Sequence, residues 1–358
     1  MVQLERSDRL RGALWGLFAG DALSSPTHWF YGGEGQVREV YGGLIRGYKK
    51  PVSHLAGSIM GKSNTDGGGR GQYSASKRTI IGDVINHGKK KYWDPSKSYH
   101  YHCTLEAGEN TLEAQLVRVL MKTMKDGSFE SDLFREAYVS FMTTPGSHND
   151  SYASTCHRMF FANLEYKKLP LKDCPDNDSH NVDAIDGLVL PTVSALAEAY
   201  VFGDRSRAKK IASETCGATR KSTILQKAAE HWTDVLCDVF LDDKDAAEAA
   251  GFSGATSKLK KKRDPVVACY LASALPACLE MTAKYADADV FEALMANANA
   301  GGENVHRGAL LGAVLGANAG DSKLPPELKA GLDPRLKHEI DTFIQALDDR
   351  RHRIQGEL

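Results

Sequence analysis

Glycine recurs at every fourth position near both ends of the chain. The stretch GALWGLFAGDAL contains Gly12, Gly16 and Gly20, and the stretch GALLGAVLGANAG contains Gly308, Gly312, Gly316 and Gly320. Residues four apart lie on one face of a helix. Each glycine lowers the stability of a helix by about 1 kcal/mol relative to alanine. Because glycine has no side chain, it also allows a second backbone to approach closely. We therefore expect these two helices to cross with glycine row against glycine row, which would bring Asp21 and Glu303 into one neighbourhood.

Apolar residues recur at helical spacing along most of the chain, and strand patterns are nearly absent. Besides the glycine-row helices, starting with 9–23, the pattern predicts helices at 112–124, 132–141, 153–164, 183–200, 205–215, 222–240, 265–285, 287–298 and 334–349. Residues 31–108 lack this period and are rich in glycine and aromatic residues, which favours a packed, lid-like insertion. Within it, Tyr99–His102 alternates so that both histidines would share one side of an extended segment. The sequence thus predicts one all-α domain spanning residues 1–358.

Composition narrows the function classes. The net charge of the 358 residues is −1, so no overall field favours nucleic acid or an anionic membrane. The basic run Lys258–Arg263 has no interleaved aromatic residues and is expected to be a solvated surface. No run reaches the roughly 20 apolar residues of a membrane span. Seven cysteines without a C-x-x-C pair favour reduced thiols and a cytoplasmic location.

The tripeptide Gly-Glu-Asn occurs twice, at 108–110 and at 302–304, each time before an apolar helix. Asparagine is a good helix cap, and a glutamate is favourable beside a helix N-terminus, so capping alone accounts for either copy. Two copies also suggest that two helix N-termini point into a shared pocket. Such a pocket would suit an anion such as a diphosphate, or a cation held by Glu109 and Glu303.

Three segments together resemble the ADP-ribosylglycohydrolase superfamily. They are GALWGLFAGDAL at 12–23, GENTLEAQLVRVL at 108–120 and GGENVHRGALLGAVLGANAG at 301–320, and their order along the chain is the specific signal. The resemblance implies an all-α orthogonal bundle, in agreement with the helical pattern. The segments GDALSSPTHWFY, HYH, AGENT, TTPGSHND and GGENVHRGA look like the branch of J-type crystallins and selenoprotein J.

The resemblance also implies a metal site, from which this chain departs. Typical enzymes of the family hold two Mg²⁺ ions on the motifs Thr-Asp-Asp-Thr and Gly-Gly-Asp-x-Asp-Thr. The first motif falls on residues 108–111, where only Thr111 keeps its identity, and the second falls on 303–306, with Val305 and His306 at two ligand positions. Carboxylates supply most Mg²⁺ affinity, and two remain, Glu109 and Glu303. We expect at most one divalent cation, with His28 and His306 favouring Zn²⁺ or another transition metal.

The candidate site residues follow from these positions. His28 stands where the family has a glutamate that acts on the ribosyl bond, and a histidine is a competent general acid or base. The alternative is a structural role, in which His28 is a hydrogen-bonded histidine beside Trp29. The catalytic candidates are His28, Glu109 and Asp21. The substrate-binding candidates are Asn110, Thr111, His148, Asn149, Asp150, Asn304 and His306. For His148, Asn149 and Asp150, which end the segment GSHND, the alternative is a structural turn that caps the next helix.

Two functions remain open. The first is a hydrolase of the ADP-ribosylglycohydrolase type, acting on a C–N or N-glycosidic bond of a small or nucleotide-like substrate, with water activated by His28 or Glu109. The second is a catalytically inactive descendant that binds an ADP-ribose-like ligand or serves as a crystallin-like structural protein. Loss of the aspartates favours the second, whereas the polar residues kept at those positions favour the first. Nucleic-acid binding is expected of neither.

Overall fold

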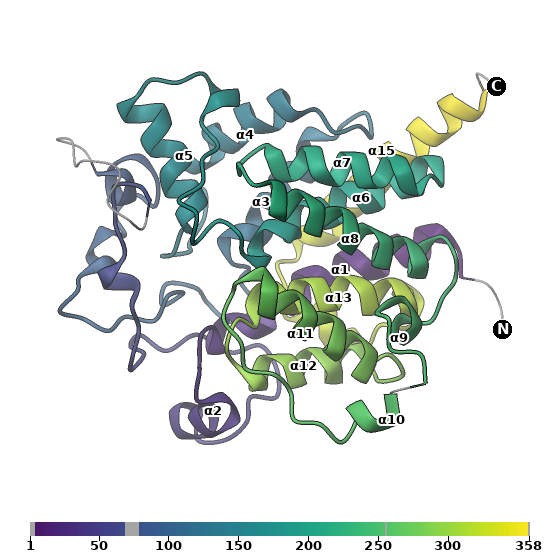
Figure 1. Cartoon of the computed structure of the whole chain (residues 1–358), viewed down its shortest axis with the longest axis horizontal. Helices are drawn as coiled ribbons and strands as arrows, with labels where there is room; N and C mark the ends of the chain where they lie inside the picture. Colours follow the sequence, from purple (N-terminus) through teal and green to yellow (C-terminus); the bar gives the residue numbers. More distant parts are fainter. Residues whose placement is uncertain (1–3, 69–78, 255, 357–358) are drawn as a thin grey trace.

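The computed structural model describes residues 4–68, 79–254 and 256–356. Within these ranges the chain forms helices and short helical turns, with isolated bridges but no strand, so the predicted all-α fold is confirmed (Figure 1). The α-helices are α1 (Arg6–Ser24), α2 (Gly33–Tyr41), α3 (Leu112–Thr123), α4 (Ser131–Thr143), α5 (Thr155–Tyr166), α6 (Val189–Phe202), α7 (Arg205–Gly217), α8 (Thr223–Phe240), α9 (Ala246–Ala249), α10 (Thr256–Leu259), α11 (Leu271–Lys284), α12 (Val290–Ala300), α13 (Val305–Ala319), α14 (Pro326–Ala330) and α15 (Arg335–Gly356).

Helices α1 and α13 form the centre of the fold and lie side by side (Figure 1). Their glycine rows face each other, as the spacing predicts. A Cβ added to Gly16 would lie 1.9 Å from the carbonyl oxygen of Gly312, and one added to Gly20 would lie 1.9 Å from that of Gly308. Neither backbone leaves space for a methyl group. The close crossing fixes the C-terminal end of α1 against the N-terminal end of α13, which is where the candidate site lies.

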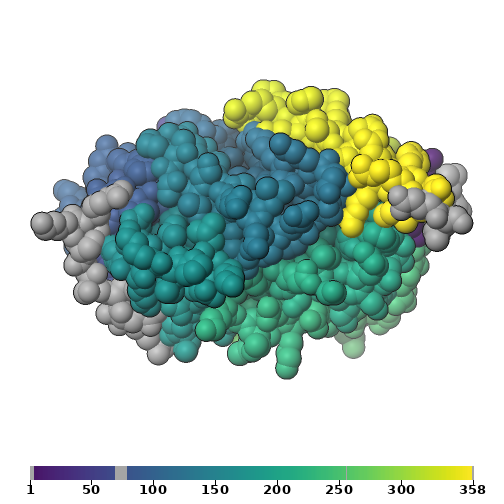
Figure 2. All heavy atoms as spheres, turned by 90° about the horizontal axis from the view of Figure 1, so that it is seen from above, coloured from purple at the N-terminus to yellow at the C-terminus, as the bar shows by residue number. Residues whose placement is uncertain are grey.

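The remaining helices surround this pair. Helix α6 is buried along almost its whole length, and α15 crosses the surface, where Figure 2 shows the C-terminal segment in yellow. There Arg118 of α3 donates to both carboxylate oxygens of Glu339, at 2.6 and 2.9 Å. The run Ile185–Phe202 is long and apolar enough to cross a membrane by composition, but 94% of it is buried inside the protein. It therefore has the character of a core helix.

Three helix boundaries differ from the prediction by six residues or more, and one of them is the end of the helix expected at 334–349, which continues to Gly356. The helix expected at 265–285 begins at Leu271, because the preceding residues run extended and the carbonyl of Val267 accepts the backbone N–H of Glu303 at 2.8 Å. The helix expected at 183–200 begins with the 3-10 turn Ile185–Leu188. Helix α2 was not predicted, since a glycine-rich start at Gly33 hid its helical period. Backbone partners distant in sequence account for the late start at Leu271.

The segment 31–108 holds α2 and short helical turns, and its residues 69–78 lie outside the described part of the chain. It is tied to the helical body rather than free. Nε1 of Trp93 donates to the carbonyl of Ser151 at 3.0 Å, and the amide of Asn86 donates to the carbonyl of Asp150 at 3.1 Å. The segment therefore contributes side chains to the site described next.

Candidate active site

Five buried side chains from distant parts of the sequence form one hydrogen-bonded chain. Oδ1 of Asp150 lies 2.8 Å from Nδ1 of His102, and Nε2 of His102 lies 2.7 Å from Nδ1 of His28. Nε2 of His28 lies 3.1 Å from Oε2 of Glu303, whose Oε1 lies 2.8 Å from Nδ1 of His306. The order along the chain is therefore one carboxylate, two imidazoles, a second carboxylate and a last imidazole, that of His306. We call it the histidine–carboxylate chain.

Its members are held by the ends of the two central helices. His28 follows the 3-10 turn Ser25–Thr27 that ends α1, and Glu303 precedes the first turn of α13. The backbone N–H of Trp29 donates to the carbonyl of Gly302 at 2.8 Å, which joins these two segments. Trp29 adopts the left-handed conformation with φ of 60°, uncommon for a bulky residue and often found at functional sites. Its ring stacks on His28 with centroids 3.8 Å apart.

The electrostatics of the chain follow from burial and proximity. Burial lowers the pKa of His28 to about 4, despite the nearby Glu303 carboxylate. Burial would also raise the pKa of Glu303, but His28 and His306 hold it well below its usual range. The pKa of Asp150 is lowered as well, because His102 and two backbone N–H groups outweigh its burial. Both carboxylates are therefore ionised at neutral pH, and His28 is neutral.

His306 is the end of the chain that can meet a ligand. Burial alone would lower its pKa, but Glu303 outweighs burial and raises the pKa to about 9. Its side chain keeps 7% exposure, whereas those of His28 and Glu303 have none. With Nδ1 directed at Glu303, Nε2 makes no hydrogen bond within the described residues. A carboxylate that orients one imidazole nitrogen and leaves the other free is the arrangement of a general acid–base histidine.

Asp21 joins α1 to the start of α3. Its Oδ1 accepts from the amide of Asn110 and the backbone N–H of Thr111, both at 2.8 Å, and its Oδ2 accepts from the Thr111 hydroxyl at 2.5 Å. Burial raises the pKa of Asp21 although these donors oppose it. Asp21 is 1% exposed, so this geometry gives it, Asn110 and Thr111 a positioning task. The expected neighbourhood with Glu303 takes the form of an electrostatic interaction between Asp21 and His306.

The expected anion pocket at two helix N-termini is wrong. The N-terminal N–H groups of α3 already bind protein carboxylates, since Leu112 donates to Oδ2 of Asp150 at 2.9 Å. At α13, the N–H of His306 donates to Oε1 of Glu303 at 3.2 Å. Asn304 is the N-cap residue of α13, but its side chain makes no capping hydrogen bond, since its amide donates to Thr27 and to a carbonyl of α12. The N-cap residue of α3 is Thr111, so Asn110 is not a cap. The protein's own acidic residues occupy the places expected for an external anion.

Two further expectations need correction. Glu303 has no exposed surface, so it cannot face Glu109 across an open cleft. Glu109 lies elsewhere, with its Oε2 accepting from the backbone of Glu106 at 2.7 Å and from the Asn149 amide at 3.0 Å. His28, expected to act on the substrate directly, is fully buried. Glu109, His148 and Asn149 line a separate cavity.

The comparisons with known proteins agree with the all-α fold. The model of the ADP-ribosylglycohydrolase family matches residues 3–356. The chain belongs to the ADP-ribosylglycohydrolase family. Among solved structures, an "ADP-ribosylglycohydrolase-related protein complex" has 14% sequence identity and a TM-score of 0.54, covering 97% of this chain and 98% of that chain; at this identity the likeness shows the fold alone. No curated protein matches the chain.

Two Mg²⁺ ions of the family type do not fit the residues present here. Both oxygens of Asp21 accept protein hydrogens, Glu303 is shared by two imidazoles, and Val305 is a fully buried apolar residue. Mg²⁺ requires several oxygen ligands in near-octahedral geometry. His28, Glu303 and His306 do place ligand atoms within 4.8 Å of one another, but one ion there would have to displace the hydrogens that join them. Glu109 is not part of that cluster.

Several residues of this region escaped the sequence analysis. His102 was noticed only through its alternation with Tyr101. A second buried network was not foreseen: Nη2 of Arg220 lies 2.9 Å from Asp186 and 3.2 Å from Glu113, which pairs with His157 at 2.7 Å. Glu113 looked like an ordinary first-turn glutamate, and no local pattern distinguishes Asp186 or Arg220.

Proposed function

We propose that the protein hydrolyses a C–N or N-glycosidic bond of a nucleotide-like small molecule, with His306 as general acid and base. The observation that carries this proposal is the histidine–carboxylate chain ending at His306. The protein belongs to a family named for glycohydrolase activity. The motif resemblance to the J-type crystallin and selenoprotein J branch is part of the same proposal.

One nitrogen, Nε2 of His306, serves both proton transfers of the reaction. Protonated at neutral pH, His306 gives its Nε2 proton to the leaving atom as the bond to the sugar carbon breaks. Water adds to that carbon, and the neutral Nε2 takes the proton that the water loses. Glu303 keeps the imidazole oriented and stabilises its charged form throughout. His28, His102 and Asp150 act through Glu303 and are positioning residues.

Groups near His306 suit a sugar. Oδ1 of Asp186 and Nη1 of Arg220 are buried and have no hydrogen-bond partner within the described residues, and Asp186 is close enough to raise the pKa of His306. Buried polar atoms without partners are uncommon in native proteins. A ribose hydroxyl can donate to Asp186 and accept from Arg220. Tyr31 is 58% exposed and supplies an aromatic face. Burial raises the pKa of Tyr31, and the charge of Glu303 adds to this effect, so the two side chains lie near each other. Segment 31–108, which carries Tyr31 and His102, would act as the lid over His306.

Turnover of a substrate panel tests the proposal. ADP-ribose joined to arginine or serine, NAD⁺ and simple nucleosides are incubated with the wild-type protein, His306→Gln and the exposed control His352→Gln. We expect hydrolysis of at least one member, a loss of 10²-fold or more in His306→Gln, and no loss in the control. Full activity in His306→Gln would refute the assignment.

The inactive binding protein is the second candidate, and the replacement of the family's metal positions by hydrogen bonds favours it. Calorimetric titration with ADP-ribose separates the two. Saturable binding of ADP-ribose by a wild-type protein that turns over no panel member would establish the binding function instead.

A further inference from the structure

A polar cavity lies next to the Asp150 end of the histidine–carboxylate chain. Asn86, which lines the cavity, donates to the carbonyl of Asp150. Its volume is about 330 Å³, within the range of small-molecule sites. No member of the chain lines it. The residues that do line it are Asn86, His87, Lys89, Glu109, Gln115, Met142, Thr144, Gly146, Ser147, His148, Asn149 and Arg335.

One cation and one anion face this cavity without pairing with each other. Nζ of Lys89 donates to the carbonyl of His148 at 2.7 Å, and it makes no ion pair within the described residues, although an ammonium has three hydrogens. Glu109 accepts only from the uncharged donors named above. The charges of Asp150 and Glu109 act on Lys89, so the two groups are close but more than 4.0 Å apart. Arg335, the other cation, is paired with Asp333 at 2.6 Å.

Two buried polar atoms of the lining residues also have no partner. Oδ1 of Asn86 makes no hydrogen bond within the described residues, and Asn86 is 1% exposed. Its amide donates to the carbonyl of Asp150 at 3.1 Å, which fixes the orientation of the side chain. Nδ1 of His148 is likewise unpartnered. A carbonyl-type oxygen only accepts hydrogen bonds, so a ligand that pairs with it would carry N–H or O–H hydrogens.

We propose that this cavity binds a small α-amino acid as its zwitterion. The carboxylate of the ligand pairs with Lys89, and its ammonium lies between Glu109 and Oδ1 of Asn86. A simple anion would satisfy Lys89 but leave Glu109 opposing it. A quaternary amine would satisfy the charges but leave Asn86 without a donor.

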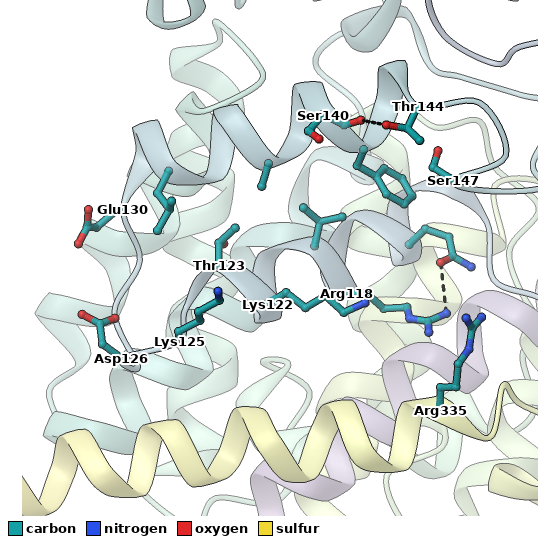
Figure 3. Close-up of a pocket in the computed structure, with 15 residues that line it drawn as sticks. Arg118, Lys122, Thr123, Lys125, Asp126, Glu130, Ser140, Thr144, Ser147 and Arg335 are labelled. Carbon is teal, nitrogen blue, oxygen red and sulfur yellow. Dashed lines mark hydrogen bonds between the residues drawn. The ribbon is translucent and has the colours of Figure 1, made fainter.

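The neighbouring cavity gives the ligand's side chain a place. It has a volume of about 670 Å³ and shares Gln115, Thr144, Ser147 and Arg335 with the first cavity. Figure 3 shows this second cavity, whose lining includes the apolar side chains Val119, Leu133 and Phe141. An apolar side chain that extends between α3 and α4 would contact Phe141, which lies one turn before the shared Thr144. We therefore expect leucine or phenylalanine to bind more tightly than glycine.

Calorimetric titration of the whole protein tests the proposal. The probes are L-leucine, L-phenylalanine, glycine, the N-trimethyl form of leucine, isovalerate, isoamylamine and inorganic phosphate. We expect saturable binding of leucine or phenylalanine, and at least tenfold weaker binding of every probe that lacks the carboxylate, the ammonium or the N–H hydrogens. No saturable binding of either amino acid would overturn the proposal and leave a water-filled cavity. Phosphate binding as tightly as leucine would overturn it in favour of an anion site.

Variants locate the binding. Lys89→Met and Glu109→Gln are each expected to weaken leucine binding at least tenfold, and the exposed control Lys97→Met is expected to leave it unchanged. Glu109→Gln keeps an oxygen for the Glu106 and Asn149 donors, so it remains informative if Lys89→Met does not fold. Leucine binding unaffected by Glu109→Gln would contradict the zwitterion assignment. The His306→Gln variant should bind leucine normally, because this cavity does not depend on the proposed hydrolysis.

Discussion

Nδ1 of His28 and Nε2 of His102 lie 2.7 Å apart, so one hydrogen must lie between two imidazole nitrogens. The outer nitrogens of this pair face the carboxylates of Glu303 and Asp150, which can only accept when ionised. Three contacts therefore need three hydrogens on four ring nitrogens, and the pair carries one positive charge.

Removal of the Asp150 charge should therefore be costly. In Asp150→Asn the positive charge of the His28–His102 pair loses one of its two buried counter-charges, and we expect the free energy of unfolding to fall by about 3–5 kcal/mol. Urea denaturation measures the change. The control Asp132→Asn, whose side chain is 84% exposed, should shift stability by less than about 1 kcal/mol. Equal effects of the two variants would show that the His28–His102 pair carries no positive charge.

The glycine rows give a prediction about packing. A methyl group at residue 16 would overlap the carbonyl of Gly312, and since both partners are backbone, neither can yield without separating α1 from α13. We expect Gly16→Ala to lower the free energy of unfolding by about 3 kcal/mol or more. Gly35→Ala is the matched control: Gly35 lies in α2 with open space around it, and alanine there should stabilise the protein by up to about 1 kcal/mol. Melting temperatures that fall equally in both variants would contradict the close crossing.

This packing could be read from the sequence because a row of glycines in a helix has one common physical use. Helix types and most boundaries followed likewise from local periodicity. The histidine–carboxylate chain could not be read in this way, since His28 and Glu303 are 275 residues apart and the local contact of Glu303 with His306 does not reveal the distant partners. The repeated Gly-Glu-Asn pointed to two helix starts but not to what fills them. There Asp21, Asp150 and Glu303 bind the free N–H groups themselves, which only the tertiary structure reveals.

The buried pair of Glu113 and His157 gives stability a pH window. Burial opposes charge on His157, but Cys156 and Glu113 raise its pKa to about 10, so its contribution is complete below about 6.5 and is lost as the pH rises through about 10. The pKa of Glu113 falls to about 2, because His157 and Arg220 outweigh burial. Its contribution is complete above 4.5 and is lost as the pH falls through about 2.

The stability difference between the wild type and Glu113→Gln should therefore be greatest near pH 5.5, at about 3–5 kcal/mol, and smaller above pH 10. Urea unfolding at a series of pH values measures it. Glu214→Gln serves as the control because Glu214 is 47% exposed in a long surface pair with Lys210. A difference that stays constant with pH would mean that His157 is neutral in the folded protein.

Magnesium should not be needed for the fold or for the proposed reaction. Hydrogen bonds within the protein occupy Asp21 and Glu303, so an ion would gain little there and would break the histidine–carboxylate chain. An ion present at 100 times its Kd stabilises a protein by about 2.7 kcal/mol, which for a chain of this size is roughly 4 °C in Tm. We expect Tm to differ by less than about 1 °C between EDTA and excess Mg²⁺, and elemental analysis to find less than one Mg²⁺ per chain. Two tightly held ions per chain, or a rise in Tm of several degrees with Mg²⁺, would show that the family's metal site survives here with other ligands.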